Sequence, residues 1–260
     1  SPTYAEEVKT AKYGEGMEEL LSSRPGGVTG IVNGIDLAEN DPGRDPVLAV
    51  RYGTADFGAG KAANKAELQR RLGLDADPGA PVYAVASRFA HQKGIDLVLE
   101  AADAVLAAGG QLVLTGSGDK ELEEAAEALA AAHPGRVARH PFDTVFVKLV
   151  YAAADFLLMP SRFEPCGLSQ LIAQRYGTLP IATKTGGLAD TIVDGRDGFH
   201  AAEFSAAALR SAIARAAALF SDGPALAAAR LRAMEKDSSW AASIDRYLAL
   251  YARLLTGRKA

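Results

Sequence analysis

The chain has 260 residues, of which 48% are hydrophobic and 23% are charged, and its formal net charge is −4. This composition excludes a chain that is disordered throughout, and the acidic balance argues against a nucleic-acid-binding protein, whose binding face would be a basic stripe. No apolar run of about 18 residues is present, so no membrane span and no membrane partner are expected.

The hydrophobic pattern predicts a helical N-terminal segment, one isolated strand, and then a regular alternation of strands and helices. Residues 38–60 lack periodicity and are expected to be irregular, and the chain after Phe199 is expected to be helical. Short apolar strands that alternate with helices indicate a doubly wound, Rossmann-like α/β domain with a parallel sheet, here with extra C-terminal helices. The expected strands are 28–32, 82–86, 111–115, 136–139, 155–159 and 179–183, and the expected helices are 5–13, 61–72, 95–108, 120–132, 145–153, 166–176, 188–193, 206–220, 224–235 and 239–255.

In such a sheet ligands lie beyond the carboxyl ends of the strands, so the loops that follow the strands are the candidate site. The loop after 82–86 carries Arg88 and Lys93, two cations suited to a phosphate or pyrophosphate. Their spacing fits two solvated surface charges equally well. The glycine turn at 116–118 has no third glycine, and an acidic helix start follows it, so a tight turn with Asp119 as helix N-cap is expected there.

The loop after 155–159 is the most informative. It places Glu164 just before a predicted helix start, whose free N–H groups near Gly167 and Leu168 can bind an anion. A carboxylate is favourable there if it binds hydroxyls or faces a developing positive charge, and a sugar joined to a diphosphate offers both. The alternative is a capping or ion-paired carboxylate. Cys166 is not expected to be a nucleophile, because no histidine lies near it in the sequence.

A second helix start with small residues, Thr185, Gly186 and Gly187, follows the strand 179–183, although Asp190 weakens it as an anion site. The four histidines lack metal-ligand spacing, and the sequence has neither paired cysteines nor a Walker P-loop. Neither a metal nor ATP hydrolysis is therefore expected.

Together, these loops resemble the bacterial glycogen synthases and plant starch synthases. The resemblance covers nearly the whole chain, and the Glu-Pro-Cys-Gly-Leu block at 164–168 is specific to that family. It implies a two-Rossmann-domain enzyme that transfers glucose from ADP-glucose to the non-reducing 4-hydroxyl of an α-1,4-glucan, with retention and without a metal or cofactor. The matching blocks are 1–7, 32–36, 87–97, 116–119, 160–168, 185–191 and Ser239-Trp240.

Carried over residue by residue, the resemblance makes Arg88, Lys93 and Glu164 the catalytic residues. The two cations would hold the diphosphate and stabilise the departing ADP, and Glu164 would bind the glucosyl hydroxyls and stabilise an oxocarbenium-like transition state. Phe142 stands where the family has an adenine-stacking tyrosine. The implied donor-binding residues are Phe142, Cys166, Gly167, Leu168, Thr185, Gly186 and Gly187.

The resemblance also divides the chain. It implies that residues 1–28 are the tail of a largely missing acceptor domain, that 29–237 bind the nucleotide sugar, and that 238–260 form a helix that packs back on the acceptor domain. The family's Lys-x-Gly-Gly-Leu motif, which touches the donor from that domain, is absent, so the chain alone is not expected to be a complete enzyme. The last helix would then expose an apolar face and promote self-association.

Two other departures from the family concern affinity: Pro141 replaces the usual glycine before the stacking aromatic ring, and the stretch 193–199 is shorter than usual. Two alternatives stay open, namely a related glycosyltransferase with another donor and a non-catalytic nucleotide-sugar-binding module.

The expected setting is a bacterial cytoplasm. The single cysteine cannot form an intrachain disulfide, which favours a reducing compartment, and the lead-in shows nothing typical of a plastid protein. The chain begins at Ser1 without an initiator Met or a signal-like core, which is typical of a segment taken from a longer protein.

Overall fold

The computed structural model describes residues 1–257. Its centre is a six-stranded parallel sheet with the strand order β3-β2-β1-β4-β5-β6. The order reverses between β1 and β4, which pair directly through Tyr83 and Phe156. This is the strand order of a doubly wound Rossmann-like domain, so the predicted fold class is confirmed. The strands are β1 (Val82–Ala86), β2 (Gln111–Thr115), β3 (Val137–His140), β4 (Phe156–Met159), β5 (Leu179–Thr183) and β6 (Phe199–Ala201).

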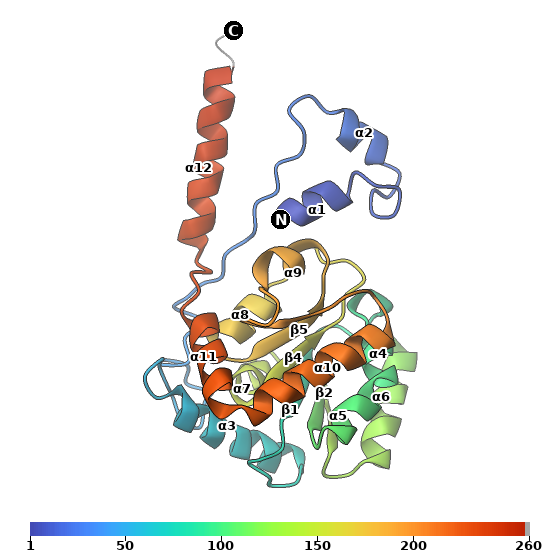
Figure 1. The fold of residues 1–260 in the computed structure, drawn as a ribbon, viewed down its shortest axis with the longest axis vertical. Coiled ribbons are helices and arrows are strands. Elements are labelled where there is room, and N and C mark those ends of the chain that lie inside the picture. The colour runs from blue at the N-terminus through green and yellow to red at the C-terminus, as the bar shows by residue number, and fades with distance from the viewer. Residues whose placement is uncertain (258–260) are drawn as a thin grey trace.

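Helices cover both faces of the sheet (Figure 1). One face is covered by α4 (Ile95–Glu100), α5 (Ala102–Ala107), α6 (Lys120–Ala132) and α10 (Ala206–Ser221), and the other by α3 (Phe57–Leu72), α7 (Phe146–Ala153) and α8 (Ser169–Arg175). Helix α11 (Gly223–Met234) contributes to both layers, because Ala229 packs in one and Met234 in the other.

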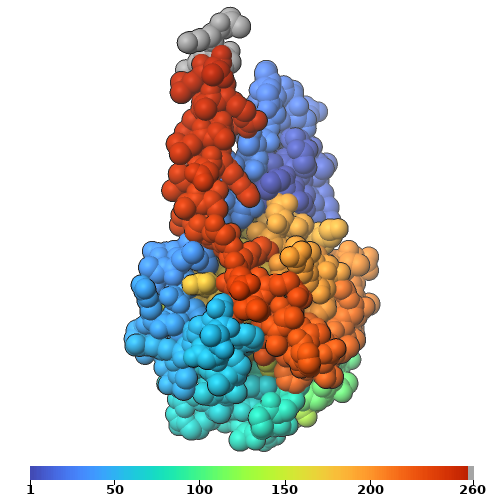
Figure 2. Space-filling model, turned by 60° about the vertical axis from the view of Figure 1, so that its left-hand side comes forward, coloured from blue at the N-terminus to red at the C-terminus, as the bar shows by residue number. Residues whose placement is uncertain are grey.

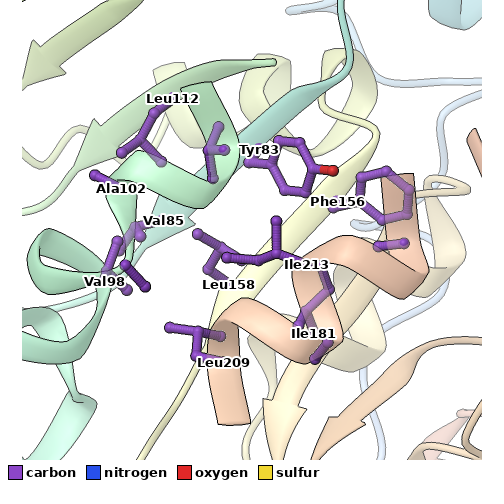
Figure 3. Packing of buried hydrophobic residues seen from close by; sticks show 14 of the residues in the cluster. Tyr83, Val85, Val98, Ala102, Leu112, Phe156, Leu158, Ile181, Leu209 and Ile213 are labelled. Atoms are coloured by element: carbon purple, nitrogen blue, oxygen red, sulfur yellow. The ribbon is translucent and has the colours of Figure 1, made fainter. Parts of the chain in front are cut away.

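The core follows from the pleat of the strands, because successive side chains of a strand point to opposite faces. Tyr83 and Val85 of β1 enter the cluster under α4, α5 and α10, whereas Ala84 enters the cluster under α3 and α7. Figure 3 shows the first cluster, where Phe156 of β4 lies beside Tyr83, their ring centroids 5.0 Å apart. Because both faces are buried, these strands are continuously apolar, which is why the sequence revealed them.

Several expected elements were wrong in detail. Residues 28–32 form no strand, and the nearest pairing is an isolated bridge between Ile35 and Ser239. The short edge strand β6 was not expected. The helix expected at 95–108 is two helices, because the backbone at Ala101 leaves the helical region (φ −96°, ψ 6°). The helix expected from 166 begins only at Ser169.

The N-terminal segment also differs from expectation. The helix expected at 5–13 is α1 (Pro2–Glu7), which has a proline in its first turn and Ser1 as its N-cap, and α2 (Glu18–Ser23) was not expected. Helix α9 (Gly186–Thr191) begins two residues earlier than predicted. Asp119 is at the N-cap position of α6 as predicted, but its side chain makes no capping hydrogen bond.

The N-terminal segment and α12 (Trp240–Gly257) rise from the same side of the body (Figure 1). In Figure 2, α12 projects from the body as a column beside the blue N-terminal segment. The backbone N–H of Ile35 donates to the carbonyl of Ser238 (2.8 Å) where the two segments leave the body. Trp240 and Tyr251 are exposed. Positions 258–260 of the last predicted segment lie outside the described residues, and none of the helices described has the length and apolar character needed to cross a membrane.

Candidate active site

The loops after β1 and β4 meet at the point where the strand order reverses. The backbone N–H of Arg162 donates to the carbonyl of Gln92 (2.9 Å), and the side-chain amide of Gln92 donates to the carbonyl of Phe163 (2.8 Å). At Gly94 the loops approach so closely that a Cβ would lie 2.0 Å from the carbonyl oxygen of Pro160, and the backbone has a φ of +69°. Only glycine meets both conditions.

This junction joins two of the predicted catalytic residues. Glu164 is only 6% exposed, and its Oε2 lies 2.5 Å from the Nζ of Lys93. The hydroxyl of Ser161 also donates to this carboxylate (3.3 Å). A buried carboxylate needs a charged partner and hydrogen bonds, and here it has both. The ion-paired alternative for Glu164 is therefore correct for this structure, and it does not exclude a role with a ligand.

A pocket of about 340 Å³ opens beside this pair and is lined by Arg88, Lys93 and Phe142. The Arg88 side chain is exposed and makes neither an ion pair nor a side-chain hydrogen bond with any of residues 1–257. The ring of Phe142 is 52% exposed. Two cations and a free aromatic face around one hollow suit a nucleoside diphosphate, with the phosphates at the cations and the base on the ring.

Sequence analysis missed other residues that line this pocket. Lys148 of α7 adds a third cation there, and its Nζ donates to the carbonyl of Glu39 (3.1 Å). The sequence could have indicated Lys148, because it is a charged residue within an otherwise apolar helix. The stretch that holds Glu39 and Asn40 gave no signal, because only the folded chain brings it to the sheet.

Because α8 begins only at Ser169, the residues that follow Glu164 on the same loop lie outside the helix. The N–H groups of Gly167 and Leu168 precede the helix and have no hydrogen-bond partner among residues 1–257. Cys166 is half-buried, its Sγ accepts from the N–H of Asn33 (3.4 Å), and burial raises the pKa of its thiol. A raised pKa keeps the thiol protonated, which agrees with the prediction that Cys166 is not a nucleophile.

The loop at Thr185, Gly186 and Gly187 lies against the Glu164 loop and does not line the pocket. The N–H of Gly187 donates to the carbonyl of Glu164 (2.8 Å), and a Cβ at Gly186 would lie 2.0 Å from the same oxygen. The polar groups expected to be free are taken by Glu7 of α1. Its Oε1 accepts from the hydroxyl of Thr185 and from the N–H of Gly186, both at 3.0 Å.

Asp190 also serves this docking of α1, because its carboxylate accepts from the N–H (3.0 Å) and the hydroxyl (2.6 Å) of Thr3. Sequence reasoning did not single out Glu7, whose only signal was its place in the matching block 1–7. Among the side chains described, no group of three or more His, Cys, Asp or Glu is arranged to hold a metal ion.

A doubly wound sheet with cations, an aromatic face and a buried carboxylate gathered at its switch point defines a glycosyltransferase domain. The sequence matches the family described as glycosyl transferases group 1 over residues 68–220, and the chain belongs to that family. The predicted resemblance to a glycosyltransferase family is therefore confirmed.

Two bacterial glycogen synthases and one plant starch synthase structure are similar to nearly the whole chain. The chain is 45% identical to the glycogen synthase of Rhodospirillum rubrum, over 99% of this chain and 54% of that protein, and 48% identical to the glycogen synthase of Myxococcus xanthus, over 98% and 54%. The catalytic domain of starch synthase IV from Arabidopsis thaliana, solved with ADP and acarbose, is similar in structure (TM-score 0.92, 35% identity, 97% of this chain and 54% of that one). The chain thus spans about half the length of the curated relatives it matches.

Proposed function

We propose that this chain supplies the donor half of a glycogen or starch synthase, which transfers glucose from ADP-glucose to the non-reducing 4-hydroxyl of an α-1,4-glucan with retention. The observation that carries the proposal is the pocket in which Arg88, Lys93 and Phe142 meet beside Glu164. The glycogen synthases at 45% and 48% identity support the choice of reaction, and the ADP bound to the similar starch synthase supports the choice of nucleotide.

In this proposal the chemistry is the stabilisation of departing negative charge. Arg88, whose side chain pairs with none of residues 1–257, binds the diphosphate with its planar guanidinium. Lys93 lies between Glu164 and the phosphates, so it couples the sugar end of the donor to the leaving group. Because these cations neutralise the charge that develops on ADP, the site needs neither a metal nor a cofactor for this step.

Glu164 accepts hydroxyl hydrogen bonds from the glucosyl group and opposes the positive charge that develops at its ring. The N–H groups of Gly167 and Leu168, with Cys166 beside them, contact the donor from the same loop. The loop of Thr185, Gly186 and Gly187 contributes indirectly by supporting the Glu164 loop, because its contacts are with Glu164 and Cys166. The bacterial glycogen synthases among its relatives support a bacterial cytoplasm as the setting.

Calorimetric titration with ADP, ADP-glucose and UDP-glucose tests the proposal. We expect the adenine ligands to bind and UDP-glucose to bind more weakly. Arg88→Ala should weaken ADP binding by about tenfold or more, because hydrogen bonds between charged groups are the strong ones. Arg253→Ala, on the exposed face of α12, is the matched control and should have no effect. Tighter binding of UDP-glucose would indicate another donor, and no binding of any of the three would contradict the proposal.

We further propose that residues 29–237 bind the donor, whereas residues 1–28 and 238–260 face the acceptor domain. Ile244, Leu248, Tyr251 and Leu255 lie three or four residues apart on α12 and are all exposed. An apolar stripe of this kind favours self-association of the isolated chain. Sedimentation should therefore show dimers that Leu248→Glu disrupts, and a monomer at all concentrations would contradict this.

A further inference from the structure

The turn of Gly116, Ser117 and Gly118 directly follows β2, the strand that lies between β1 and β3, and the proposed donor chemistry does not use it. The sequence indicated only a tight turn at this point. In the structure the turn continues the sheet beyond the ends of its strands. It pairs on one side with the loop that carries Arg88 and on the other with the loop that carries Phe142.

On the side of β1, the turn fixes the residues directly before and after Arg88. The N–H of Ser87 donates to the carbonyl of Thr115 (3.2 Å), and the N–H of Phe89 donates to the carbonyl of Ser117 (3.0 Å). The ring of Phe89 is fully buried in the core. Arg88 therefore lies between two anchored neighbours, although its own side chain is exposed.

The two glycines of the turn make this close approach possible. A Cβ at Gly116 would lie 2.0 Å from the carbonyl oxygen of Ser87, and a Cβ at Gly118 would lie 2.0 Å from the carbonyl oxygen of Phe89. The requirement is one of space, because neither glycine has a φ in the left-handed region. A larger residue at either position would push the turn and the neighbouring loop apart.

A charged pair holds the turn and the ring of Phe89 from the other side. The Oε1 of Glu123 accepts from the N–H of Gly118 (2.6 Å), and its Oε2 lies 3.7 Å from the Nη2 of Arg139. The guanidinium carbon of Arg139 lies 4.7 Å from the ring centroid of Phe89. The attraction of a cation to an aromatic face thus links the turn to the residue that follows Arg88.

On the side of β3, the turn holds the chain that leads to Phe142. The N–H of Gly116 donates to the carbonyl of His140 (3.2 Å), and the N–H of Phe142 donates to the hydroxyl oxygen of Ser117 (3.3 Å). The ring of Phe142 is half-exposed, so packing alone does not fix it. Its direction depends on the backbone, which Ser117 holds.

The strand register places Ser117 between the two proposed donor contacts. The bridge between Phe89 and Gly118 continues the register of β1 with β2, so Arg88 lies opposite Ser117. The bond of Phe142 to Ser117 continues the register of β2 with β3. Because neighbouring strands are about 4.8 Å apart, the backbones of Arg88 and Phe142 are held about 10 Å apart.

We propose that the turn at 116–118 is the positioning element of the donor site, in which Ser117 positions Phe142 and Gly118 positions Arg88. This inference rests on the proposed function. A nucleoside diphosphate must meet the cation with its phosphates and the ring with its base at the same time, so a fixed spacing between them lowers the cost of binding. Neither Ser117 nor Gly118 lines the nucleotide pocket, so both act through the residues that they hold.

Calorimetric titration of the 260-residue chain with ADP tests Ser117, at concentrations high enough to saturate the weakest variant. Ser117→Ala should weaken ADP binding about threefold, because it removes the acceptor that holds the backbone of Phe142. The same change should have no effect in a chain that already carries Phe142→Ala, and its full effect should persist beside Arg88→Ala. Ser221→Ala, which removes an exposed hydroxyl at the end of α10, is the matched control.

The same titration tests Gly118 against the other contact. Gly118→Ala should weaken ADP binding by about tenfold or more, because it displaces the loop of Arg88 and with it a bond between charged groups. This loss should vanish beside Arg88→Ala and persist beside Phe142→Ala. Gly58→Ala on α3, where an added Cβ meets no atom within 4 Å, is the matched control. Thermal melting of each variant checks the fold, and the Ser117 variants test the turn even if Gly118→Ala unfolds.

The outcomes separate this inference from the proposed function. Losses that disappear only beside the matching partner variant support the turn as the positioning element. If the wild-type chain binds ADP and the variants of the turn bind it equally well, the inference is wrong and the donor site stands. The same holds if their losses are equal in every background, because that is the result of a general structural role. If the wild-type chain does not bind ADP, the proposed function fails and this inference fails with it.

Discussion

The Rossmann-like body and the N-terminal segment are held in different ways. The body is built around two large clusters of buried apolar side chains, one on each face of its sheet. In the segment 1–28, by contrast, Ala5 is the only buried apolar side chain. The segment is fixed by polar contacts instead, in which Thr3 binds Asp190 and Glu7 binds Thr185 and Gly186.

The contrast between the body and the N-terminal segment shows which contacts hold each part of the candidate site in place. The proposed nucleotide pocket lies largely on loops that directly follow strands, so the packing of the core fixes the position of these loops. A second hollow, of about 320 Å³, is lined by Phe163 and by Tyr4 and Tyr13 of the N-terminal segment, so it is formed only when this segment docks, and its geometry depends on a few exposed or half-buried hydrogen bonds. Changes in the body should therefore alter global stability, and changes in the segment should alter local order.

The largest expected effect comes from the core. Phe156→Ala removes a fully buried ring that stacks on Tyr83 in the middle of the sheet, and it should lower the free energy of unfolding by about 3–5 kcal/mol. Leu248→Ala on α12, where the side chain is 58% exposed, should change it by less than about 0.5 kcal/mol. Urea denaturation measures both, and equal losses would show that α12 is part of the same cooperative unit as the sheet.

A second test of the body concerns its buried ion pairs. Asp155 is buried, accepts from the N–H of Val82 (2.8 Å), and pairs with Lys65 (3.0 Å) and Arg230. Burial acts to raise the pKa of Asp155, but Arg230, Lys65 and the Val82 N–H outweigh it and hold that pKa below its ordinary value.

A carboxylate with a lowered pKa stabilises the fold above its unfolded-state pKa of about 4, and this contribution is lost as the pH falls through the lower folded-state value. Asp155→Asn should cost about 3 kcal/mol at neutral pH, because it leaves the buried Lys65 and the partly buried Arg230 without a counter-charge. It should also flatten the acid end of the stability profile. Parallel acid unfolding curves for the two proteins would show that Asp155 does not titrate with unfolding.

The contrast between the body and the N-terminal segment also explains which features could be predicted from the sequence. Continuous apolar strands and strand-end loops are local patterns, and they predicted the fold and the candidate residues Arg88, Lys93 and Glu164, whereas Phe142 came only from the family resemblance. Glu7 and the hollow at Phe163 depend on contacts between residues more than 150 positions apart, as in the bond of Glu7 to Gly186. No local sequence pattern predicts such docking. The strand expected at 28–32 does not form, because the apolar stretch there has no neighbouring strand with which to pair.

An intermediate effect is expected where the two regions meet, at Glu164. Glu164→Gln should weaken ADP-glucose binding by about tenfold, because hydrogen bonds from sugar hydroxyls to a carboxylate are stronger than those to an amide. Binding of ADP, which has no sugar to contact, should be unchanged or tighter, because Lys93 loses its buried counter-ion and is free for the phosphates. Calorimetry with both ligands measures the difference. An equal loss for ADP and ADP-glucose would assign Glu164 to the structure of the loop and not to the sugar.

The smallest effect is expected from the contact that docks the N-terminal segment. Glu7→Ala removes the hydrogen bonds that its carboxylate accepts from Thr185 and Gly186 at the start of α9, which should cost about 1 kcal/mol locally. Because α1 buries only Ala5, this loss should appear as faster amide hydrogen exchange in α1 and at Gly186, with little change in the melting of the sheet. Glu6→Ala, one residue away with its carboxylate paired only to Lys9 among the described residues, is the matched control. A loss of protection across β4 and β5 in Glu7→Ala would mean that the segment and the body fold as one unit, and the contrast between them would no longer hold.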